Sequence, residues 1–423
     1  MEGNAVESEG TKETIPHEEP IHDAGAEKED VFAWLQVLAA FFLNLNTWGM
    51  MNTYGVFQTY YELDLLRYQT SSNISWIGST QAFLLFLVSI ITGPIFDLGH
   101  LRSLLCIGSV LLVAGMFLLS ITTQYWQVFL TQALMMGLGF GCLYLPAPAV
   151  VSQYFDASTA LAVGASSAGS ALGGVVYPIA FTQLQSRVGF GWATRVLGFI
   201  LLATSIIPLL VMKSRVVPST TRGIIDRKAF KDIPYLLLNL GLFFGFMGLY
   251  IVFYYIQLYA LDRTNVSPSL AEYMLVIINA SSLPGRLIPG YYADKIGSIN
   301  MQIIMAIIST ILTFCLMAIR TEPALVVFCV LYGFAAGAFM GLPAAGVVSL
   351  SLDKSKIGTR LGMTLGFVGF GVLISNPIAG AILGKGNNWT GLIVWCGVLL
   401  AASSISLAAS RVVKVGPGPF KII

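Results

Sequence analysis

Charged residues are scarce in this chain of 423 residues. Only 10% of them are Asp, Glu, Lys or Arg, whereas 56% are hydrophobic. An average soluble domain is about 25% charged and about 45–50% apolar, so a soluble protein of this length could not cover its surface with so few charges. Long apolar runs recur from residue 31 to residue 412. The composition therefore predicts that a lipid bilayer surrounds most of the chain.

Metal-binding and redox-active residues are also rare. Of the three histidines, His17 and His22 lie in a polar tail and His100 lies in a short loop. The five cysteines lie in apolar segments and form no CxxC pair. We therefore expect no metal site, no disulfide framework and no cofactor. A net charge of +2 offers no basic surface for a nucleic acid.

The N-terminal segment differs from the rest of the chain. Residues 1–30 hold eight Glu and two Asp against Lys12 and Lys28, and they show no apolar periodicity. Such a composition is typical of a disordered, acidic cytosolic tail. The chain opens without a basic segment, and its first apolar run is too long for a signal peptide. We expect the first membrane helix to direct insertion.

Twelve apolar segments have roughly the 20 residues that a spanning helix needs. They cover 32–57, 73–96, 102–121, 125–151, 158–183, 192–212, 233–260, 270–291, 299–319, 323–350, 358–383 and 390–411. The sequence therefore predicts an all-α membrane protein with twelve transmembrane helices in two six-helix bundles. The predicted units are the tail 1–30, an N-terminal bundle 31–212, a cytosolic linker loop 213–232, a C-terminal bundle 233–412 and a short cytosolic tail 413–423.

The distribution of Lys and Arg predicts the orientation. With both termini in the cytosol, the inside segments hold 16 of the 23 basic residues, as the positive-inside rule requires. Three N-x-S/T sequons then fall on the outer side, so Asn73, Asn265 and Asn388 are candidate glycosylation sites. We expect a multi-pass protein of the plasma membrane.

An internal repeat relates the two halves of the chain. The stretch from Gly93 to Asp97, after the second apolar segment, matches Gly290 to Asp294 after the eighth, 197 residues later. Pro146 in the fourth segment and Pro343 in the tenth are separated by the same 197 residues. Two six-helix halves in parallel repeat are how many transporters enclose a substrate between halves that rock.

These repeated motifs resemble the major facilitator superfamily over the whole helical body, 31–412. That family carries Gly-x-x-x-Asp followed by basic residues between its second and third helices. The resemblance implies a cytosolic gate in which Asp97 pairs with Arg102, and Asp294 with Lys295, in one conformation and separates in the other. The alternative is that these charges only set the topology.

Other stretches are similar to the monocarboxylate-porter-like branch found in fungi. They include Asn46-Thr47-Trp48-Gly49, Gly189-Phe190-Gly191-Trp192 and the run from Asn279 to Arg286. Well-known animal members use a lysine in the first helix and an Asp four residues before the arginine of the eighth. Here Asn52 and Ser282 stand at those positions. Proton-coupled transport of lactate-like acids is therefore not implied by the resemblance alone.

One charge lies deep within a predicted span. Burying a charge at mid-membrane costs about 2.5–3.5 kcal/mol on insertion scales, so Arg286 is expected to face a wet cavity or a partner. Asn279, Ser282 and Arg286 share one helix face. We interpret this face as an anchor for an anionic or carbonyl-bearing substrate. The alternative is an arginine held by backbone carbonyl groups.

Two further helices carry candidate substrate contacts. Trp48 and Asn52 share a face of the first helix, and Tyr250 and Tyr254 share a face of the seventh. Polar groups on one face of a membrane helix point into the bundle, and tyrosine suits a bulky, partly polar molecule. Interhelical hydrogen bonding for Asn52 and an interfacial aromatic belt for Tyr254 remain open alternatives.

The function that these features favour is secondary-active, alternating-access efflux of a small organic solute, an organic acid or a secondary metabolite. Proton-coupled uptake of a monocarboxylate is the alternative, and a non-transporting membrane sensor is an alternative of another class. No catalytic cluster is visible, so an enzyme is disfavoured. Expected partners are the solute, the lipid bilayer and protons as candidate coupling ions, with the chain working as a monomer.

Overall fold

The structure is a computed structural model, and it is helical wherever it is described. The described residues are 31–155, 159–215, 223, 225–351, 357–384 and 386–416. Across these ranges every regular element is a helix. The tail expected at 1–30 and most of the tail expected at 413–423 lie outside the described residues, as does much of the central linker.

The first half of the chain forms α-helices that are interrupted by three short π-helical stretches, labelled η1, η2 and η3. Its elements are α1 (Val31–Asn44), η1 (Leu45–Gly49), α2 (Met50–Asn52), α3 (Tyr54–Tyr60), η2 (Tyr61–Leu65), α4 (Ser71–Asp97), α5 (Leu101–Leu119), α6 (Tyr125–Val128), η3 (Phe129–Met136), α7 (Gly137–Tyr144), α8 (Pro146–Val151) and α9 (Thr159–Val211). The first predicted helix thus continues to Leu65, beyond the expected end at residue 57.

The elements described after residue 215 start with η4, a short 3-10 helix within the linker, and continue through the second half. These elements are η4 (Arg227–Lys231), α10 (Ile233–Arg263), α11 (Pro268–Ala271), α12 (Met274–Ile296), α13 (Ser298–Leu316), α14 (Glu322–Gly341), α15 (Pro343–Leu350), α16 (Ile357–Leu383) and α17 (Trp389–Val415). Helix α17 runs past the expected boundary at residue 412, so the first residues assigned to the C-terminal tail are helical.

Ten helices among the described residues are long and apolar enough to cross a membrane. One of them, Ala162–Val211, spans two of the predicted segments. A kink at Gly189, where φ is 77° and ψ is 170°, divides it into two helices. Positive φ is accessible to glycine without steric cost. Helix α12 is not among the ten, and it carries Pro284, Pro289 and Arg286 within its length.

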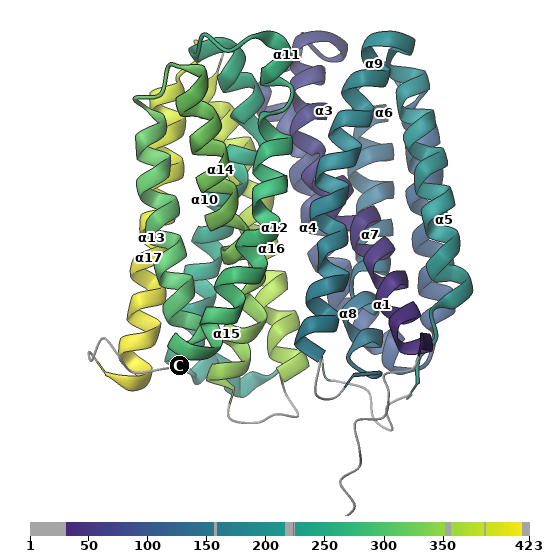
Figure 1. The fold of residues 1–423 in the computed structure, drawn as a ribbon, viewed down its shortest axis with the longest axis vertical. Helices are drawn as coiled ribbons and strands as arrows, with labels where there is room; N and C mark the ends of the chain where they lie inside the picture. The colour runs from purple at the N-terminus through teal and green to yellow at the C-terminus, as the bar shows by residue number, and fades with distance from the viewer. Residues whose placement is uncertain are drawn as a thin grey trace, which may run out of the picture.

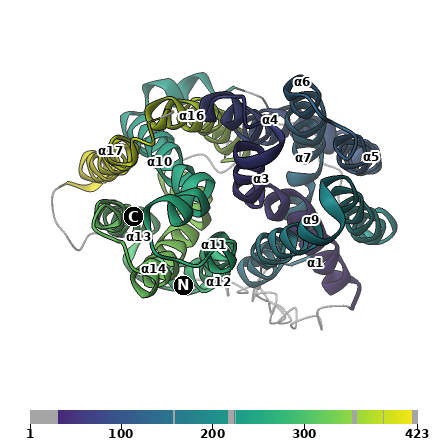
Figure 2. The same ribbon diagram turned by 90° about the horizontal axis from the view of Figure 1, so that it is seen from above.

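The two halves of the chain stand side by side. Figure 1 shows upright helices, with the first half on the right and the second half on the left. Seen from above, each half forms its own group (Figure 2). The groups meet where α4 packs against α16, α9 against α12 and α3 against α10. The interface between halves therefore runs along the middle of the molecule.

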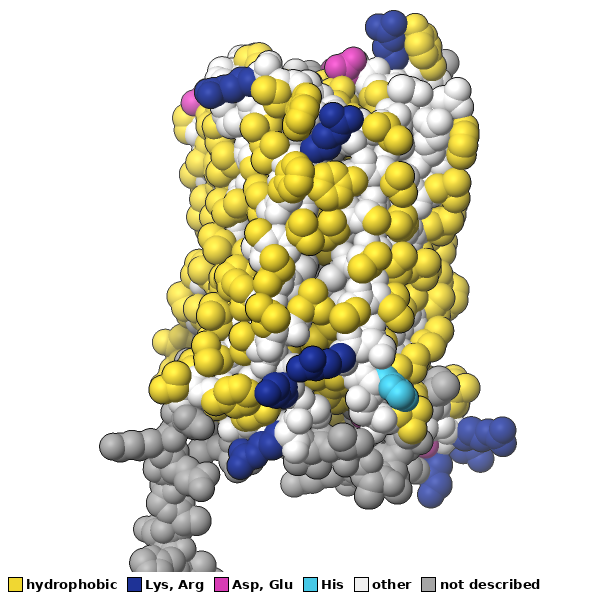
Figure 3. Space-filling view, turned by 90° about the vertical axis from the view of Figure 1, so that its right-hand side faces the viewer, with side chains coloured by type: hydrophobic (Ala, Val, Ile, Leu, Met, Phe, Trp, Pro, Cys, Tyr) yellow, Lys and Arg dark blue, Asp and Glu magenta, His cyan; other side chains and the backbone are white. Residues whose placement is uncertain are grey.

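The outer wall of the bundle is apolar. Figure 3 shows hydrophobic side chains covering the middle of one face, with Lys and Arg gathered towards the two ends. Large apolar side chains such as Val110, Phe199 and Ile206 are exposed on this wall. An exposed apolar band between charged ends suits a hydrocarbon core about 30 Å thick.

The halves are pressed together more tightly at one end. We call the end that carries Asn73 and Asn388 the sequon end, and the opposite end the linker end. Towards the sequon end, a Cβ on Gly55 would lie 2.2 Å from the carbonyl oxygen of Phe253, and one on Gly380 would lie 2.7 Å from the Ser72 nitrogen. Towards the linker end, a Cβ on Gly362 would meet nothing within 4 Å.

Candidate functional site

Arg286 lies in the middle of α12 and bridges the two halves. Its Nη1 donates a hydrogen bond to the hydroxyl of Ser170 on α9. Its Nη2 lies 4.0 Å from the sulfur of Met340 on α14. The third nitrogen, Nε, is buried and finds no partner in the described part of the chain. The guanidinium thus retains a donor that a ligand or water could use.

Two tyrosines approach the guanidinium from different halves. Tyr144 ends α7 and Tyr250 lies on α10, and both are close enough to interact electrostatically with Arg286. The Tyr250 hydroxyl is buried, and no described residue is hydrogen-bonded to it. Together with Ser170, these side chains bring hydroxyl groups from three helices around a single positive charge.

An aromatic wall continues from this charge across the interface. The Trp48 ring lies 5.5 Å from the Tyr144 ring and 5.6 Å from the Phe86 ring, as measured between centroids. Phe246 of the second half lies 6.3 Å from Phe86 and 6.2 Å from Tyr250. Aromatic faces from both halves can therefore contact a flat, apolar solute body next to the guanidinium.

Two other predicted residues also have unused polar atoms. Asn52 is only 3% exposed, and its Oδ1 has no hydrogen-bond partner among the described residues. The Tyr254 hydroxyl is likewise buried and unpaired within the described ranges. The Tyr254 ring lies 4.8 Å from that of Tyr54 in the first half. These atoms increase the hydrogen-bonding capacity of the interface.

Asn279 and Ser282 form hydrogen bonds within their own helix. The Asn279 Nδ2 donates to the Leu275 carbonyl oxygen at 3.0 Å, and the Ser282 hydroxyl donates to the Asn279 carbonyl oxygen at 2.7 Å. A Cβ on Gly174 of α9 would lie 2.7 Å from the Asn279 Oδ1. Asn279 thus packs α12 closely against the first half, beside the Arg286 face.

Three residues around the guanidinium were not among the predicted contacts. These residues are Ser170, Tyr144 and Met340. Tyr144 lies two residues before the repeated proline Pro146, and Met340 lies three residues before Pro343. Their places shortly before the repeated prolines were the signal available in the sequence.

The predicted gate residues lie at the linker end. Asp97 ends α4 and is only 3% exposed, whereas Arg102 in the first turn of α5 is exposed. Lys295 is exposed, with its Nζ 4.7 Å from the centre of the Tyr291 ring. The side chain of Asp294 lies outside the described residues. The two predicted gate pairs remain predictions.

A separate ion-pair cluster anchors the linker to α16. The Arg360 Nε lies 3.1 Å from Asp226, and its Nη1 lies 2.9 Å from Asp232. The Thr359 hydroxyl donates to the carbonyl oxygen of Gly223 at 2.7 Å. All of these residues belong to the linker or the second half. In the sequence, Arg360 contributed only to the count of basic residues on the inner side, and the cluster was not predicted.

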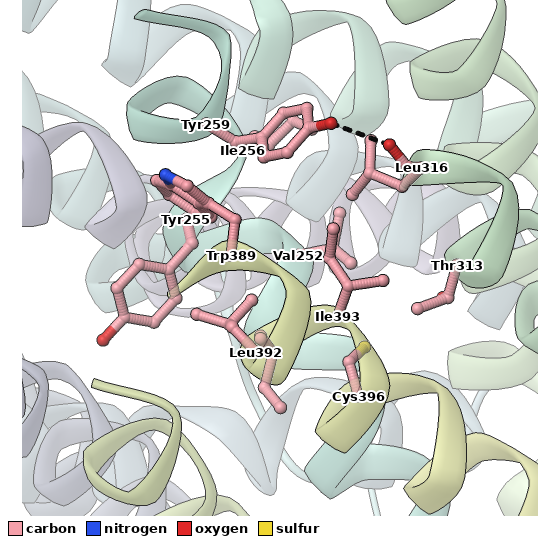
Figure 4. A pocket seen from close by; sticks show the side chains of 11 residues that line it. Val252, Tyr255, Ile256, Tyr259, Thr313, Leu316, Trp389, Leu392, Ile393 and Cys396 are labelled. Carbon is pink, nitrogen blue, oxygen red and sulfur yellow. Dashed lines mark hydrogen bonds between the residues drawn. The ribbon is translucent and has the colours of Figure 1, made fainter. Parts of the chain in front are cut away.

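An apolar pocket lies within the second half, away from the interface charge. Figure 4 shows its lining between α10, α13 and α17, where Tyr259 donates to the carbonyl oxygen of Leu316 at 2.7 Å. The hydroxyl of Thr313 is already bonded to the Ser309 carbonyl oxygen. The pocket therefore offers little to a polar solute, and Arg286 marks the better candidate site.

The three sequon asparagines are exposed at the sequon end. Asn73 lies in the first turn of α4, and its Nδ2 donates to Gln69 at 3.0 Å. Asn388 caps α17 by accepting a hydrogen bond from the Gly391 nitrogen at 3.0 Å. Asn265 bonds through its backbone nitrogen to the Arg320 carbonyl oxygen. Their exposure leaves glycosylation as an untested prediction.

A comparison with family models matches residues 34–364 to the Major Facilitator Superfamily. Among curated proteins, MFS-type transporter dbaD of Emericella nidulans is 46% identical over 380 residues, covering 89% of this chain and 86% of that protein. The Aspyridones efflux protein apdF of the same species is 37% identical over 371 residues, covering 88% and 74%. The Agnestins efflux protein AgnL12 of Paecilomyces divaricatus is 35% identical over 386 residues, covering 91% and 88%.

Proposed function

Because the chain belongs to the major facilitator superfamily, we propose that this multi-pass membrane protein is a secondary transporter that exports a small organic solute. In this proposal its polypeptide crosses the membrane twelve times, with two crossings in α9, one on each side of Gly189, one in α12 and nine in the other apolar helices. The names of two relatives, which describe efflux of aspyridones and agnestins, support export of a secondary metabolite.

The observation that carries this proposal is the guanidinium of Arg286 at the interface of the two halves. It donates to Ser170 across the interface, and its Nε is unpaired within the described chain. A guanidinium binds carboxylates and other anionic oxygens in a fixed geometry. The neighbouring aromatic wall, which includes Trp48 and Phe246, suits an apolar ring system. The solute is therefore an organic acid with a substantial apolar body.

The unequal packing of the two ends supports alternating access. The halves are in close backbone contact near Gly55 and Gly380, whereas Gly362 has open space beside it. This is the arrangement expected of a carrier closed at the sequon end and ready to open at the linker end. With the sequon end outside the cell and both termini in the cytosol, the solute is loaded from the cytosol and released when the halves rock.

The monocarboxylate-porter-like branch is part of this proposal, but uptake of a small monocarboxylate is the weaker alternative. Asn52 and Ser282 replace the ionisable groups that serve proton-coupled uptake in that branch. The aromatic wall also offers more contact area than a three-carbon acid can use. A non-transporting sensor would share the site but would move no solute, so the flux experiment below separates it from a transporter.

Replacing Arg286 tests the function. Producer cells that express Arg286→Ala should retain the exported metabolite, so that its amount in the medium falls on the order of a hundredfold, as when a charge-assisted bond of about 2–3 kcal/mol is lost. Mass spectrometry of medium and cells measures this, with membrane abundance checked by immunoblot. Leu287→Ala, at the exposed neighbouring position, is the matched control and should export normally.

Three outcomes would contradict the proposal in different ways. Unchanged export by Arg286→Ala would remove the anchor. Unchanged export after deletion of the whole chain would remove the efflux function. Faster entry of radiolabelled lactate into cells expressing the native chain, abolished by Arg286→Ala, would favour uptake instead.

A further inference from the structure

A carboxyl group lies at the sequon end, outside the Arg286 site. Glu62 belongs to η2 and accepts two hydrogen bonds within the first half. The Gln58 Nε2 donates to its Oε1 at 2.6 Å, and the Ser71 hydroxyl donates to its Oε2 at 3.0 Å. Both oxygens of the carboxyl group are thus engaged, and its contacts tie the end of the first spanning helix to the start of α4.

Hydrogen bonds continue from this carboxyl group to the second half. The Gln58 Nε2 also donates to the Ser75 hydroxyl at 2.9 Å. The Ser75 oxygen lies 2.5 Å from the Tyr255 hydroxyl of α10. Beside this contact, the Ser72 hydroxyl donates to the Pro377 carbonyl oxygen of α16 at 2.8 Å. Glu62 is therefore three hydrogen bonds away from the opposite half, at the place where the sequon end is closed.

The side-chain amide of Gln58 can form a hydrogen bond with Glu62 in either protonation state. Its Oε1 is buried and has no partner among the described residues. A carboxylate only accepts hydrogen bonds, so it needs the amide nitrogen facing it, as observed. A protonated carboxyl can donate, and rotation of the amide would then let Glu62 donate to the Gln58 Oε1. The amide oxygen would then face Ser75, whose hydroxyl donates to the Ser71 carbonyl oxygen at 2.8 Å and would have to donate to Gln58 instead.

The surroundings of Glu62 supply no positive charge. No Lys, Arg or His in the described ranges is hydrogen-bonded or ion-paired to it. The first turns of α4 face it with hydroxyl groups, and the facing titratable group on α10 is Tyr255. On its own element, Asp64 is exposed. Only neutral hydrogen-bond donors stabilise the negative charge of an ionised Glu62. Closing the halves over a neutral carboxyl therefore costs less free energy than closing them over a carboxylate.

We propose that Glu62 is a proton-binding site of the sequon-end gate, and that closure of this gate takes up one proton from the solution at that end. The inference rests on the rocking mechanism of the proposed function and assigns its coupling ion a residue. Protonation favours the closed gate because a neutral carboxyl is less costly to bury than a carboxylate, and deprotonation favours opening. The closed fraction therefore falls as the pH at the sequon end rises.

The distance between the halves at this end tests the proposal without a substrate. Nitroxide labels are placed at Tyr68→Cys and Gly386→Cys, two exposed positions on opposite halves, with Cys106 and Cys315 replaced by Ser. Pulsed electron paramagnetic resonance on the full chain in lipid nanodiscs then gives the distribution of distances between the two labels at pH values from 5 to 8. We expect the closed-to-open ratio to fall with pH by up to about tenfold per unit, the limit for one proton.

Glu62→Gln is the decisive variant because it cannot titrate and resembles the neutral carboxyl. It should give the low-pH distribution at every pH, whereas Asp64→Asn, the matched exposed acid, should titrate like the parent. If Glu62→Gln does not fold, Gln58→Leu removes a donor to the carboxylate and should move the pH response to higher pH while leaving Glu62 in place. A pH response that persists in Glu62→Gln, or no response in the parent, would overturn the proposal. Neither result would affect the export test on Arg286.

Discussion

The two ends of the bundle use polar residues in opposite ways. At the sequon end, neutral hydrogen bonds cross between the halves, from Ser75 to Tyr255 and from Ser72 to Pro377. At the linker end, the strong contacts are ion pairs, and the Arg360 cluster stays within the linker and the second half. In the proposed rocking mechanism, the contacts that would break in each cycle are thus individually weak, whereas the charged contacts lie within one half and its linker.

Among the tests of this difference between the two ends, the largest effect is expected from a bulky side chain introduced at the sequon end. In Gly380→Val, a side chain would have to occupy space that lies 2.7 Å from the Ser72 backbone nitrogen. Overpacking of this kind costs about 1–3 kcal/mol or more, so closure should be hindered and export should fall on the order of tenfold. Export by producer cells and the label distance at the sequon end measure the change.

Gly362→Val on the same helix is the control for that wedge. A Cβ at Gly362 meets nothing within 4 Å, so this variant should export nearly normally. Equal loss of export in the two variants would show that the difference in packing between the ends has no functional meaning.

A smaller effect is expected from breaking the linker anchor. Arg360→Ala removes the ion pair with Asp226, whose carboxylate is 4% exposed. Such a loss should destabilise the second half by about 2 kcal/mol, seen as a lower melting temperature of the purified protein. Arg102→Ala, at an exposed position, should change stability by no more than about 0.5 kcal/mol. A stable Arg360→Ala protein would mean that the ion pairs are dispensable.

The smallest effect concerns one neutral bond across the interface. Tyr255→Phe keeps the ring and removes the hydroxyl that meets Ser75. One hydrogen bond contributes about 1 kcal/mol, so the label distance should show roughly a fivefold shift towards the open sequon end. Tyr259→Phe, whose hydroxyl bonds only within the second half, should leave the distribution unchanged. The reverse ranking of these variants would reject the view that the interface is held by neutral bonds.

Sequence patterns predicted the helical architecture well because membrane spans must be long and apolar. The same patterns predicted the ends of the helices less accurately. The end of the first helix at Leu65 was missed since Glu62 and Asp64 resemble loop residues, although Glu62 forms hydrogen bonds inside the bundle. The kink at Gly189 joins two predicted segments without a loop, because glycine can take the positive φ within a continuous chain.

The candidate site was predictable only in part. Arg286 stands out in the sequence because a charge in a membrane helix is costly wherever it lies. Its contact with Ser170 joins residues 116 positions apart, and no local pattern specifies which face of α9 meets α12. The contact between Tyr144 and Arg286 was unpredictable for the same reason, since it depends on how the two halves are placed.

The anchoring of the linker sets a geometric limit on the proposed rocking of the halves. Arg215 is attached to the first half through Gln153, and Gly223 is attached to the second half through Thr359. Seven residues lie between these attachment points, and an extended chain spans at most about 3.3–3.6 Å per residue. The two points can therefore never be more than roughly 28 Å apart, which permits small displacements and prevents complete separation of the two halves.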